Sequence, residues 1–432
     1  MFLSQVKRCG VIWNRPISLL GKPQLRVAPT NWRRFFSSNP EVEEAVEEDE
    51  DVPSRTHWRN EISIPLDVQK FVRERCKKYN HNQRENAWKE YLSLSRSRSA
   101  QKGFFDWGNE SIITPSSMKP LVYDELTCTS YLEYRLHKKQ CSSFDMTCSY
   151  SICTRVFNDV IPALPFTCQP LRMLDIGCGC GSASLAALEH FPSINHVSLV
   201  DGSEYMTDMA SSLLSLRSSA SIACYSSFPS LLDSVTRSQS DDGFDVILMD
   251  RFLSELPSDK ARASAVVIAW ELLKQNGVLA VTEEGDRWGF HHTRCTRSLL
   301  ARMNGSQRGA QPFQIVAPCP HCLECPLRNN KAHWCHFAQQ CAAGPTAAYK
   351  SRKRSAEVYS YLVARKAEGV EVHEASNRIL STPLKRNKHI LVDLCCSNGS
   401  FERRVYTKGK MMDKKEEYRT VRKSEWGGIL SV

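Results

Sequence analysis

The 432-residue sequence contains no run of apolar residues that approaches 18 in length. A helix that spans a bilayer needs about 20 such residues, so the sequence predicts no transmembrane segment. It also shows no internal repeat, and its content of 41% hydrophobic and 24% charged residues is that of an ordinary globular protein. Wholesale disorder and a fibrous architecture are therefore excluded, and two or three folded units are expected.

The first 40 residues lack acidic side chains, and they also lack the continuous apolar core of a secretory signal. Seven lysines and arginines alternate there with apolar residues, a pattern typical of a mitochondrial presequence. The Arg-Phe-Phe-Ser sequence at residues 34–37 resembles a matrix-processing pattern. We therefore expect residues 1–36 to direct import into the mitochondrial matrix and to be removed. A disordered basic tail is the alternative.

Eight acidic residues follow within residues 41–51, and we expect residues 37–58 to form a solvated, disordered linker. The net charge of the whole chain is +10, but the leader contributes +7 and the linker −8. Residues 52–432 therefore carry +11 on their own. This basic body favours an RNA-rich partner, and a soluble enzyme of high isoelectric point is the alternative.

The pattern of apolar residues divides the rest of the chain into four regions. Helical spacing predicts a helical region over 59–165, with a loop near 103–120. Over 166–304, short apolar runs such as FDVILMD alternate with helix-length segments, which predicts an α/β fold with a parallel sheet covered on both faces. Residues 305–350 are rich in Cys, Pro, Gly and His without a clear period, which predicts a loop-like insert. Final strands and a basic segment are expected over 351–432.

A glycine-rich loop closes the first predicted strand, where Asp175 is followed by Gly177, Gly179 and Gly181. The G-x-G-x-G spacing differs from the dinucleotide fingerprint G-x-G-x-x-G and resembles motif I of methyltransferases that use S-adenosylmethionine (SAM). Asp201 ends the second strand, where an acid can accept hydrogen bonds from ribose hydroxyls. These features predict a SAM site. A loop that preserves the fold and binds nothing is the alternative.

The sequence lacks the groups with which nucleic-acid methyltransferases commonly act. The sequence DRFLSELP, which begins at Asp250, occupies the place of the Asn/Asp-Pro-Pro-aromatic motif that orients a base amine. No Pro-Cys pair supplies a nucleophile at that place. We therefore name no catalytic residue. Asp250 is predicted to contact the methionine end of SAM or, alternatively, to cap a helix.

Five of the 18 cysteines fall within 23 residues of the predicted insert: Cys319, Cys322, Cys325, Cys335 and Cys341. Disulfides are not expected in a matrix protein. Clustered thiolates in an irregular loop are typical of a metal centre. Zinc would take four Cys and His ligands, which could include His321, His333 or His336, and an iron–sulfur cluster would take four Cys. The spacing fits both, and free thiols are a third interpretation.

Several motifs occur in one order: MLDIGCGCGSAS, FDVILMDRFLSELP, GVLAVTEEGDRWGF, APCPHCLECPL, WCHF, YSYLVARK and HILVDLCCSNG. Over about residues 60–427 this constellation resembles the methyltransferase-like family of mitochondrial small-ribosomal-subunit assembly factors, which has bacterial relatives. The resemblance implies a Rossmann-type class I SAM methyltransferase sheet, a SAM site and a [4Fe–4S] cluster. It also implies binding to the immature small subunit and its rRNA, with methyl transfer doubtful or lost.

Carried over by position, the resemblance implies four cluster ligands: Cys319, Cys325, Cys335 and Cys395. Two departures from the family pattern leave alternatives open. Cys322 stands where the family usually has another residue, and Cys396 competes with Cys395. A cluster held in this way would fasten the insert to the final strand and make folding depend on the supply of iron and sulfur.

These observations predict an assembly factor of the mitochondrial matrix that is not membrane-bound and acts as a monomer on the ribosomal particle. It would retain a SAM-binding fold without methyl transfer. The basic residues of segment 350–354 and of the tail at 408–423 are expected to contact rRNA phosphates. The alternatives are an active rRNA methyltransferase and a zinc-bearing methyltransferase of small molecules.

Overall fold

The computed structural model describes residues 58–101, 123–133, 146–164, 169–237, 243–305, 313–330, 332–342, 355–367, 376–411 and 413–431. The expected presequence, the acidic linker up to residue 57, the loop near 103–120 and the basic segment 350–354 lie outside these residues. The chain divides after Ser54, and all described residues belong to the second unit, Arg55–Val432. Among the described helices, none is both long and apolar enough to cross a membrane.

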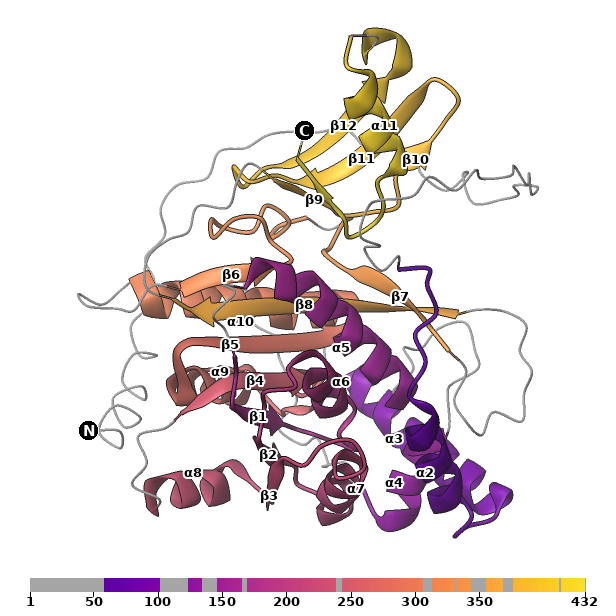
Figure 1. Cartoon of the computed structure of the whole chain (residues 1–432), viewed down its shortest axis with the longest axis vertical. Helices are drawn as coiled ribbons and strands as arrows, with labels where there is room; N and C mark the ends of the chain where they lie inside the picture. Colours follow the sequence, from indigo (N-terminus) through magenta and orange to yellow (C-terminus); the bar gives the residue numbers. More distant parts are fainter. Residues whose placement is uncertain are drawn as a thin grey trace. The chain divides into compact units, whose positions relative to one another are not determined.

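The centre of the protein is an eight-stranded sheet with the order β3-β2-β1-β4-β5-β8-β6, in which β7 also pairs with β8 (Figure 1). Its strands are β1 (Arg172–Ile176), β2 (His196–Val200), β3 (Ser221–Tyr225), β4 (Phe244–Asp250), β5 (Leu273–Glu284), β6 (Phe313–Ala317), β7 (Phe337–Cys341) and β8 (Ser355–Lys366). Strands β1 to β5 are parallel, whereas β8 runs antiparallel to β5, β6 and β7. Met173, Leu174 and Ile176 of β1 are fully buried, because both faces of a parallel sheet are covered.

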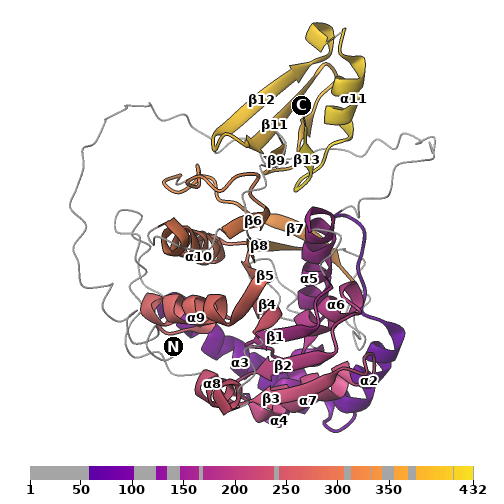
Figure 2. The same cartoon turned by 60° about the vertical axis from the view of Figure 1, so that its left-hand side comes forward.

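Helices cover both faces of this sheet, as Figure 2 shows. Apolar side chains of α5 (Met146–Val160), α6 (Ser182–His190) and α7 (Glu204–Leu214) share one core cluster with one face of the strands. Those of α8 (Phe228–Arg237), α9 (Asp259–Leu272) and α10 (Arg287–Gly305) share a second cluster with the other face. The predicted α/β fold, with a parallel sheet between two helical layers, is confirmed.

The predicted N-terminal helical region is confirmed by α2 (Leu66–Cys76), α3 (His81–Gln101) and α4 (Glu125–Glu133), followed by α5 and a short 3₁₀ helix, η2 (Ile161–Ala163). Val68, Val72 and Cys76 recur every four residues, so one face of α2 is buried in the core cluster that contains α5. Helices α3 and α4 pack through aromatic rings, because Trp88 and Tyr91 of α3 both meet Tyr131 of α4 edge-on, at 6.1 and 6.5 Å between centroids. This packing positions the segment that precedes α4.

A second sheet is formed by the C-terminal residues, with the order β10-β11-β9-β13 and with β12 paired to β11. Its elements are β9 (Asn377–Ile379), β10 (Leu384–Lys385), β11 (His389–Cys395), β12 (Phe401–Thr407), the 3₁₀ helix η4 (Lys408–Met411), α11 (Lys415–Lys423) and β13 (Ile429–Leu430). Tyr418 and Val421 of α11 share a core cluster with Ile390 and Val392 of β11. The short C-terminal β region expected from the sequence is therefore present.

The segment expected to be a loop-like insert contains two strands, β6 and β7, and both join the main sheet through β8. Sequence periodicity did not reveal them, because each is only five residues long and Gln side chains interrupt the apolar residues. The expected boundaries at residues 304 and 350 therefore do not separate the segment from the sheet. Irregular structure is confined to residues 318–336, as far as these residues are described.

Candidate functional site

The glycine-rich loop joins β1 to α6, and all three of its glycines have positive φ: 72° at Gly177, 49° at Gly179 and 83° at Gly181. A Cβ atom at Gly177 would lie 2.5 Å from the side chain of Phe252, and one at Gly181 would lie 2.9 Å from the Cβ of Ala210 in α7. A Cβ at Gly179 would meet no atom within 4 Å. The outer glycines are therefore required by packing, whereas Gly179 leaves space for a ligand to approach the backbone.

Asp201 follows β2, at the carboxyl ends of the parallel strands, where ligands of such sheets bind. Its carboxylate accepts hydrogen bonds from the backbone N–H groups of Gly179, at 3.0 Å, and Ser203, at 2.9 Å. Burial raises the pKa of Asp201 above its ordinary value, and the backbone hydrogen bonds oppose this shift. The structure therefore brings Asp201 and Gly179 together in the lining of one pocket.

Asp175 lies beneath the loop and does not line the pocket. Its Oδ2 accepts a hydrogen bond from the hydroxyl of Ser184 at 2.6 Å, and within the described residues its Oδ1 has no partner. Burial raises the pKa of Asp175 to about 7. Of the six predicted cofactor residues, Gly177, Gly179, Asp201 and Asp250 line the pocket, whereas Asp175 and Gly181 do not.

Asp250 ends β4 and lines the same pocket. The hydroxyls of Ser149 in α5 and Thr282 in β5 donate hydrogen bonds to its two carboxylate oxygens. The helix-cap alternative does not apply to α9, because Ser258 caps that helix by accepting a hydrogen bond from the N–H of Ala261. These hydroxyl partners could not be predicted from the sequence, because they lie more than 30 residues away from Asp250 in either direction along the chain.

Arg251, next to Asp250, has a φ of 54°, which is uncommon for a residue with a side chain. Its N–H donates a hydrogen bond to the carbonyl of Thr282 at 2.7 Å, which continues the pairing of β4 with β5. The guanidinium is buried, and the neighbouring Asp250 carboxylate raises the pKa of Arg251 against the effect of burial. A buried cation therefore stands beside the carboxylate at the end of β4.

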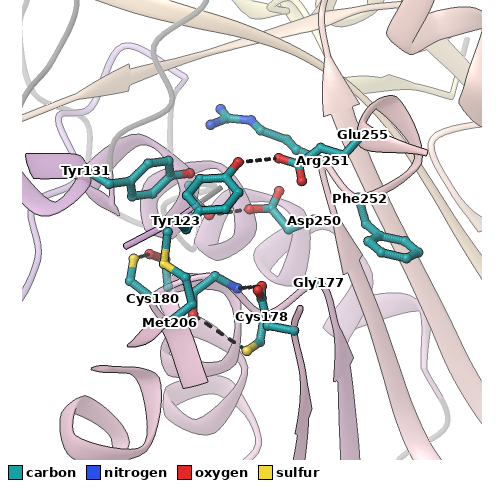
Figure 3. Close-up of a pocket in the computed structure, with 14 residues that line it drawn as sticks. Tyr123, Tyr131, Gly177, Cys178, Cys180, Met206, Asp250, Arg251, Phe252 and Glu255 are labelled. Carbon is teal, nitrogen blue, oxygen red and sulfur yellow. Dashed lines mark hydrogen bonds between the residues drawn. The ribbon is translucent and has the colours of Figure 1, made fainter. Parts of the chain in front are cut away.

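The segment before α4 and α4 itself close one side of the pocket with Tyr123 and Tyr131. The Tyr123 hydroxyl donates a hydrogen bond to Glu255 Oε1 at 3.0 Å, and Figure 3 shows this contact beside Asp250. The pocket encloses about 560 Å³ of space that no protein atom fills, including its opening to solvent. Neither tyrosine was predicted from the sequence, because Tyr123 and Tyr131 belong to no motif that indicates a ligand.

The two cysteines of the glycine loop are not activated nucleophiles. Cys178 and Cys180 are buried, and burial raises the pKa of Cys180 to about 11 and that of Cys178 well above its ordinary value. Both thiols therefore stay protonated near neutral pH, and a thiol is a far weaker nucleophile than a thiolate.

A second cavity brings together all four cysteines that the resemblance implies as cluster ligands: Cys319, Cys325, Cys335 and Cys395. Three of them come from segment 318–336 and the fourth from the end of β11. Cys322, in contrast, is exposed and does not line this cavity. The Cys396 side chain belongs to the core of the C-terminal sheet.

Among the four thiols, that of Cys395 is buried and the other three are partly buried. Burial raises the pKa of Cys325 to about 11, and it raises the pKa of each of the other three, with neighbouring thiols adding to the effect for Cys335 and Cys395. The described cysteines form no disulfide. No group of three or more His, Cys, Asp or Glu side chains in the described part of the chain could hold a metal ion as it stands.

Arg297 of α10 lines the same cavity and is almost completely buried. Its guanidinium donates hydrogen bonds to the carbonyls of His321 and Leu323, while its Nε has no partner among the described residues. His321 Nε2 lies 3.3 Å from Cys395 Sγ, and burial and Arg297 lower the pKa of His321 to about 4. His321 is therefore neutral at physiological pH and can donate or accept one hydrogen bond at Cys395.

The strand order, the G-x-G-x-G loop and the acid that ends β2 define a Rossmann-type fold of the class I SAM methyltransferases. The chain belongs to the Rsm22 family, whose family model is described as mitochondrial small ribosomal subunit Rsm22 and matches residues 139–431. The family resemblance predicted from the sequence is thereby confirmed.

Two relatives illustrate this membership. The human ribosome assembly protein METTL17, mitochondrial, is 27% identical over 380 residues, which cover 87% of this chain and 76% of the relative. The Rsm22-cox11 tandem protein 2, mitochondrial, of Schizosaccharomyces pombe is 26% identical over 304 residues, or 62% of this chain and 39% of the yeast protein. Both relatives are mitochondrial by name.

Solved structures of methyltransferases are similar to part of the chain. The N-methyltransferase NodS from Bradyrhizobium japonicum WM9, in complex with S-adenosyl-L-homocysteine, has a TM-score of 0.31 at 13% identity, covering 49% of this chain and 86% of NodS. An rRNA methylase from Streptococcus thermophilus has a TM-score of 0.28 at 11% identity, covering 49% and 95%. These scores are too low to carry an argument, so the fold is assigned from the strand order.

Proposed function

We propose that this protein is an assembly factor of the mitochondrial small ribosomal subunit that acts in the matrix and binds the immature subunit through its rRNA. The observation that carries the proposal is membership of the Rsm22 family over residues 139–431. The name of the human relative, a mitochondrial ribosome assembly protein, supports the same role. The basic body of the chain, at +11 over residues 52–432, suits an RNA partner.

The glycine-loop pocket is proposed to bind SAM. Gly179 offers an unobstructed backbone, Asp201 provides the carboxylate for the ribose hydroxyls, and Asp250 lies at the end of β4 toward the methionine end. When bound, SAM carries an electrophilic methyl group. These residues of the pocket would bind and orient the cofactor.

Methyl transfer is not expected from this pocket. Both oxygens of Asp250 already accept hydroxyl hydrogen bonds, so this carboxylate is poorly placed to take a proton from an acceptor. The loop thiols are protonated, and the contact between Tyr123 and Glu255 closes part of the opening. We therefore propose that SAM stabilises the fold that binds the subunit.

The cavity lined by Cys319, Cys325, Cys335 and Cys395 is proposed to hold a [4Fe–4S] cluster. Four cysteines are the usual donor set of such a cluster. The buried guanidinium of Arg297, with its unpartnered Nε, would offset the negative charge of thiolates and cluster.

The proposal is tested by sedimentation of tagged protein from mitochondrial lysates. We expect the protein to migrate with the small subunit or its precursors, and subfractionation should place it in the matrix. Its absence from these fractions while they contain assembling subunits would contradict the proposed role. Anaerobic purification should yield iron and acid-labile sulfide with absorbance near 400 nm, whereas zinc without sulfide would exclude the cluster.

The second candidate is an active rRNA methyltransferase, which the intact glycine loop and Asp201 favour. It predicts transfer of labelled methyl groups from SAM to small-subunit rRNA, with loss of transfer in a Gly179→Arg variant. Our proposal predicts no transfer above the background of that variant. In both cases the wild-type protein should bind SAM and the variant should not.

A further inference from the structure

Positive charges gather at one end of the C-terminal sheet. Four exposed basic residues, which we call the basic end, occupy the turn between β10 and β11 and the start of η4: Arg386, Lys388, Lys408 and Lys410. They are brought together because β11 pairs antiparallel with both neighbours, so that His389 lies opposite Thr407. The N–H of Lys408 then donates a hydrogen bond to the carbonyl of Lys388 at 2.9 Å.

These four cations differ from the other charges of the same sheet. No described carboxylate forms an ion pair with any residue of the basic end, whereas Arg403 pairs with Asp393 at 2.6 Å farther along the strands. At α11, the N-cap residue Lys414 pairs with Glu417 at 3.3 Å, and Arg419 pairs with Glu416 at 2.5 Å. The basic end therefore presents positive charge that this part of the chain does not itself neutralise.

An apolar row lies beside the basic end. Leu384, Leu391 and Val405 occupy directly opposite positions on β10, β11 and β12, so their side chains share one face of the sheet. Ile390 and Val392 point to the opposite face, which α11 covers. Leu384 is 53% exposed and Val405 is 58% exposed. Large apolar side chains with this exposure, next to unpaired cations, are typical of a binding surface.

We propose that the basic end and the apolar row form a docking surface for a single-stranded segment of RNA. The four cations contact backbone phosphates, and the apolar row packs against the riboses and base faces that a single strand leaves uncovered. Unpaired cations without interspersed carboxylates fit the uniform charge of a phosphodiester backbone. This inference rests on the proposed function and deepens it by naming the surface that holds the rRNA.

The test compares three variants of the full chain, each checked by thermal unfolding against wild type. The first is R386Q/K388Q/K408Q/K410Q. The matched control, K414Q/K415Q/R419Q/K423Q, removes the same number of positive charges from α11 and its N-cap residue. The third, L384S/V405S, removes the exposed apolar groups and leaves the charges in place. The probe is transcribed small-subunit rRNA, with binding constants measured from about 50 to 200 mM salt.

Each phosphate contact to a single strand contributes about 0.7 to the slope of log affinity against log salt. We expect the first variant to lose about 2 to 3 units of slope and at least 10-fold in affinity. The α11 control should lose less than one unit, and L384S/V405S should lose affinity about 3-fold with the slope unchanged. Equal losses in the first variant and the α11 control would overturn the inference, because net charge alone would then explain them.

Three further outcomes show whether the inference fails alone or together with the function on which it rests. If wild type and the first variant bind rRNA and sediment with the subunit equally well, the inference fails and the proposed function stands. If the first variant keeps its rRNA affinity but no longer sediments with the subunit, the surface binds an acidic protein, and the RNA proposal fails. If wild type itself binds neither rRNA nor the subunit, both fail together.

Discussion

At the scale of single residues, the three glycines of the loop have different structural roles, although all have positive φ. Adding one methyl group distinguishes them, because a Cβ at Gly181 would stand 2.9 Å from Ala210 Cβ and one at Gly179 would meet nothing within 4 Å. An alanine at Gly179 or at Gly181 would suffer similar backbone strain, because both positions have positive φ. A difference in stability or in SAM affinity between the two variants would therefore come from packing at Gly181 and from the space for the ligand at Gly179.

We expect Gly181→Ala to lower the free energy of unfolding by about 3 kcal/mol, from backbone strain and overpacking together. Gly179→Ala should lower it by about 1 kcal/mol from strain alone, and it should weaken SAM binding at least 10-fold, since the new methyl group occupies ligand space. Urea unfolding and calorimetric titration measure the two effects. Equal destabilisation by both substitutions would contradict the assignment.

Asp175 makes stability depend on pH. Its folded-state pKa of about 7 lies above the value of 3.8 that is ordinary for the unfolded chain, so the folded protein binds the extra proton between these values. Stability therefore falls as pH rises from about 4 to 7, by at most about 4 kcal/mol from this group. Unfolding of wild type and Asp175→Asn should converge near pH 4 and diverge toward pH 7, with the variant more stable. Parallel pH profiles would refute the role of Asp175.

At the scale of elements, the start of α7 is coupled to the pocket. Ser203 caps this helix by accepting a hydrogen bond from the N–H of Met206, and its hydroxyl donates to the carbonyl of Tyr123 at 2.7 Å. Ser258 caps α9 in the same way, but its cap bond comes from Ala261 and links it to no residue that lines the pocket. The two caps therefore form a matched pair.

Ser203→Ala and Ser258→Ala should each lower the free energy of unfolding by about 1 kcal/mol through loss of a cap. Only Ser203→Ala should also weaken SAM binding, by several-fold, because Tyr123 then loses its link to α7. Titration of both variants with SAM decides this. A similar loss of SAM affinity in Ser258→Ala would show that the effect is one of general stability.

The sequence predicts the elements that have strong local patterns and misses those that depend on distant contacts. The expected strands of the parallel sheet correspond to β1, β2, β4 and β5, because each is an apolar run buried on both faces. Strand β3, at the sheet edge, is partly exposed and has no such run. Within the site, Gly179 and Asp201 follow from a motif, whereas Ser149 and Thr282 reach Asp250 only through the fold.

At the scale of the whole molecule, the four-cysteine cavity lies where the main sheet meets the C-terminal sheet. Arg378 of β9 makes a second connection there, donating hydrogen bonds to the carbonyl of Pro318 at 2.8 Å and to Asp159 at 3.1 Å. The binding free energy of a metal cluster adds to folding free energy when the ligands come from separate segments. The proposed cluster would therefore contribute to holding the two sheets together.

Cys395→Ser and Cys396→Ser test this at neighbouring positions. We expect Cys395→Ser to lose most of the iron and sulfide, to unfold at a lower temperature and to sediment less with the small subunit. Cys396→Ser should keep its iron, because that side chain packs in the core of the C-terminal sheet. Metal analysis and scanning calorimetry measure both variants. Full iron content in Cys395→Ser would rule out its role as a ligand.

The position of β8 has a consequence for incomplete chains. Because β8 lies between β5 and β6, a product that stops before residue 355 contains every parallel strand of the sheet but leaves the outer edge of β5 without its partner. An unpaired edge of a long, buried strand readily pairs with other chains. A premature stop codon before residue 355 should therefore yield a protein that aggregates, whereas loss of the final few residues would leave this sheet complete.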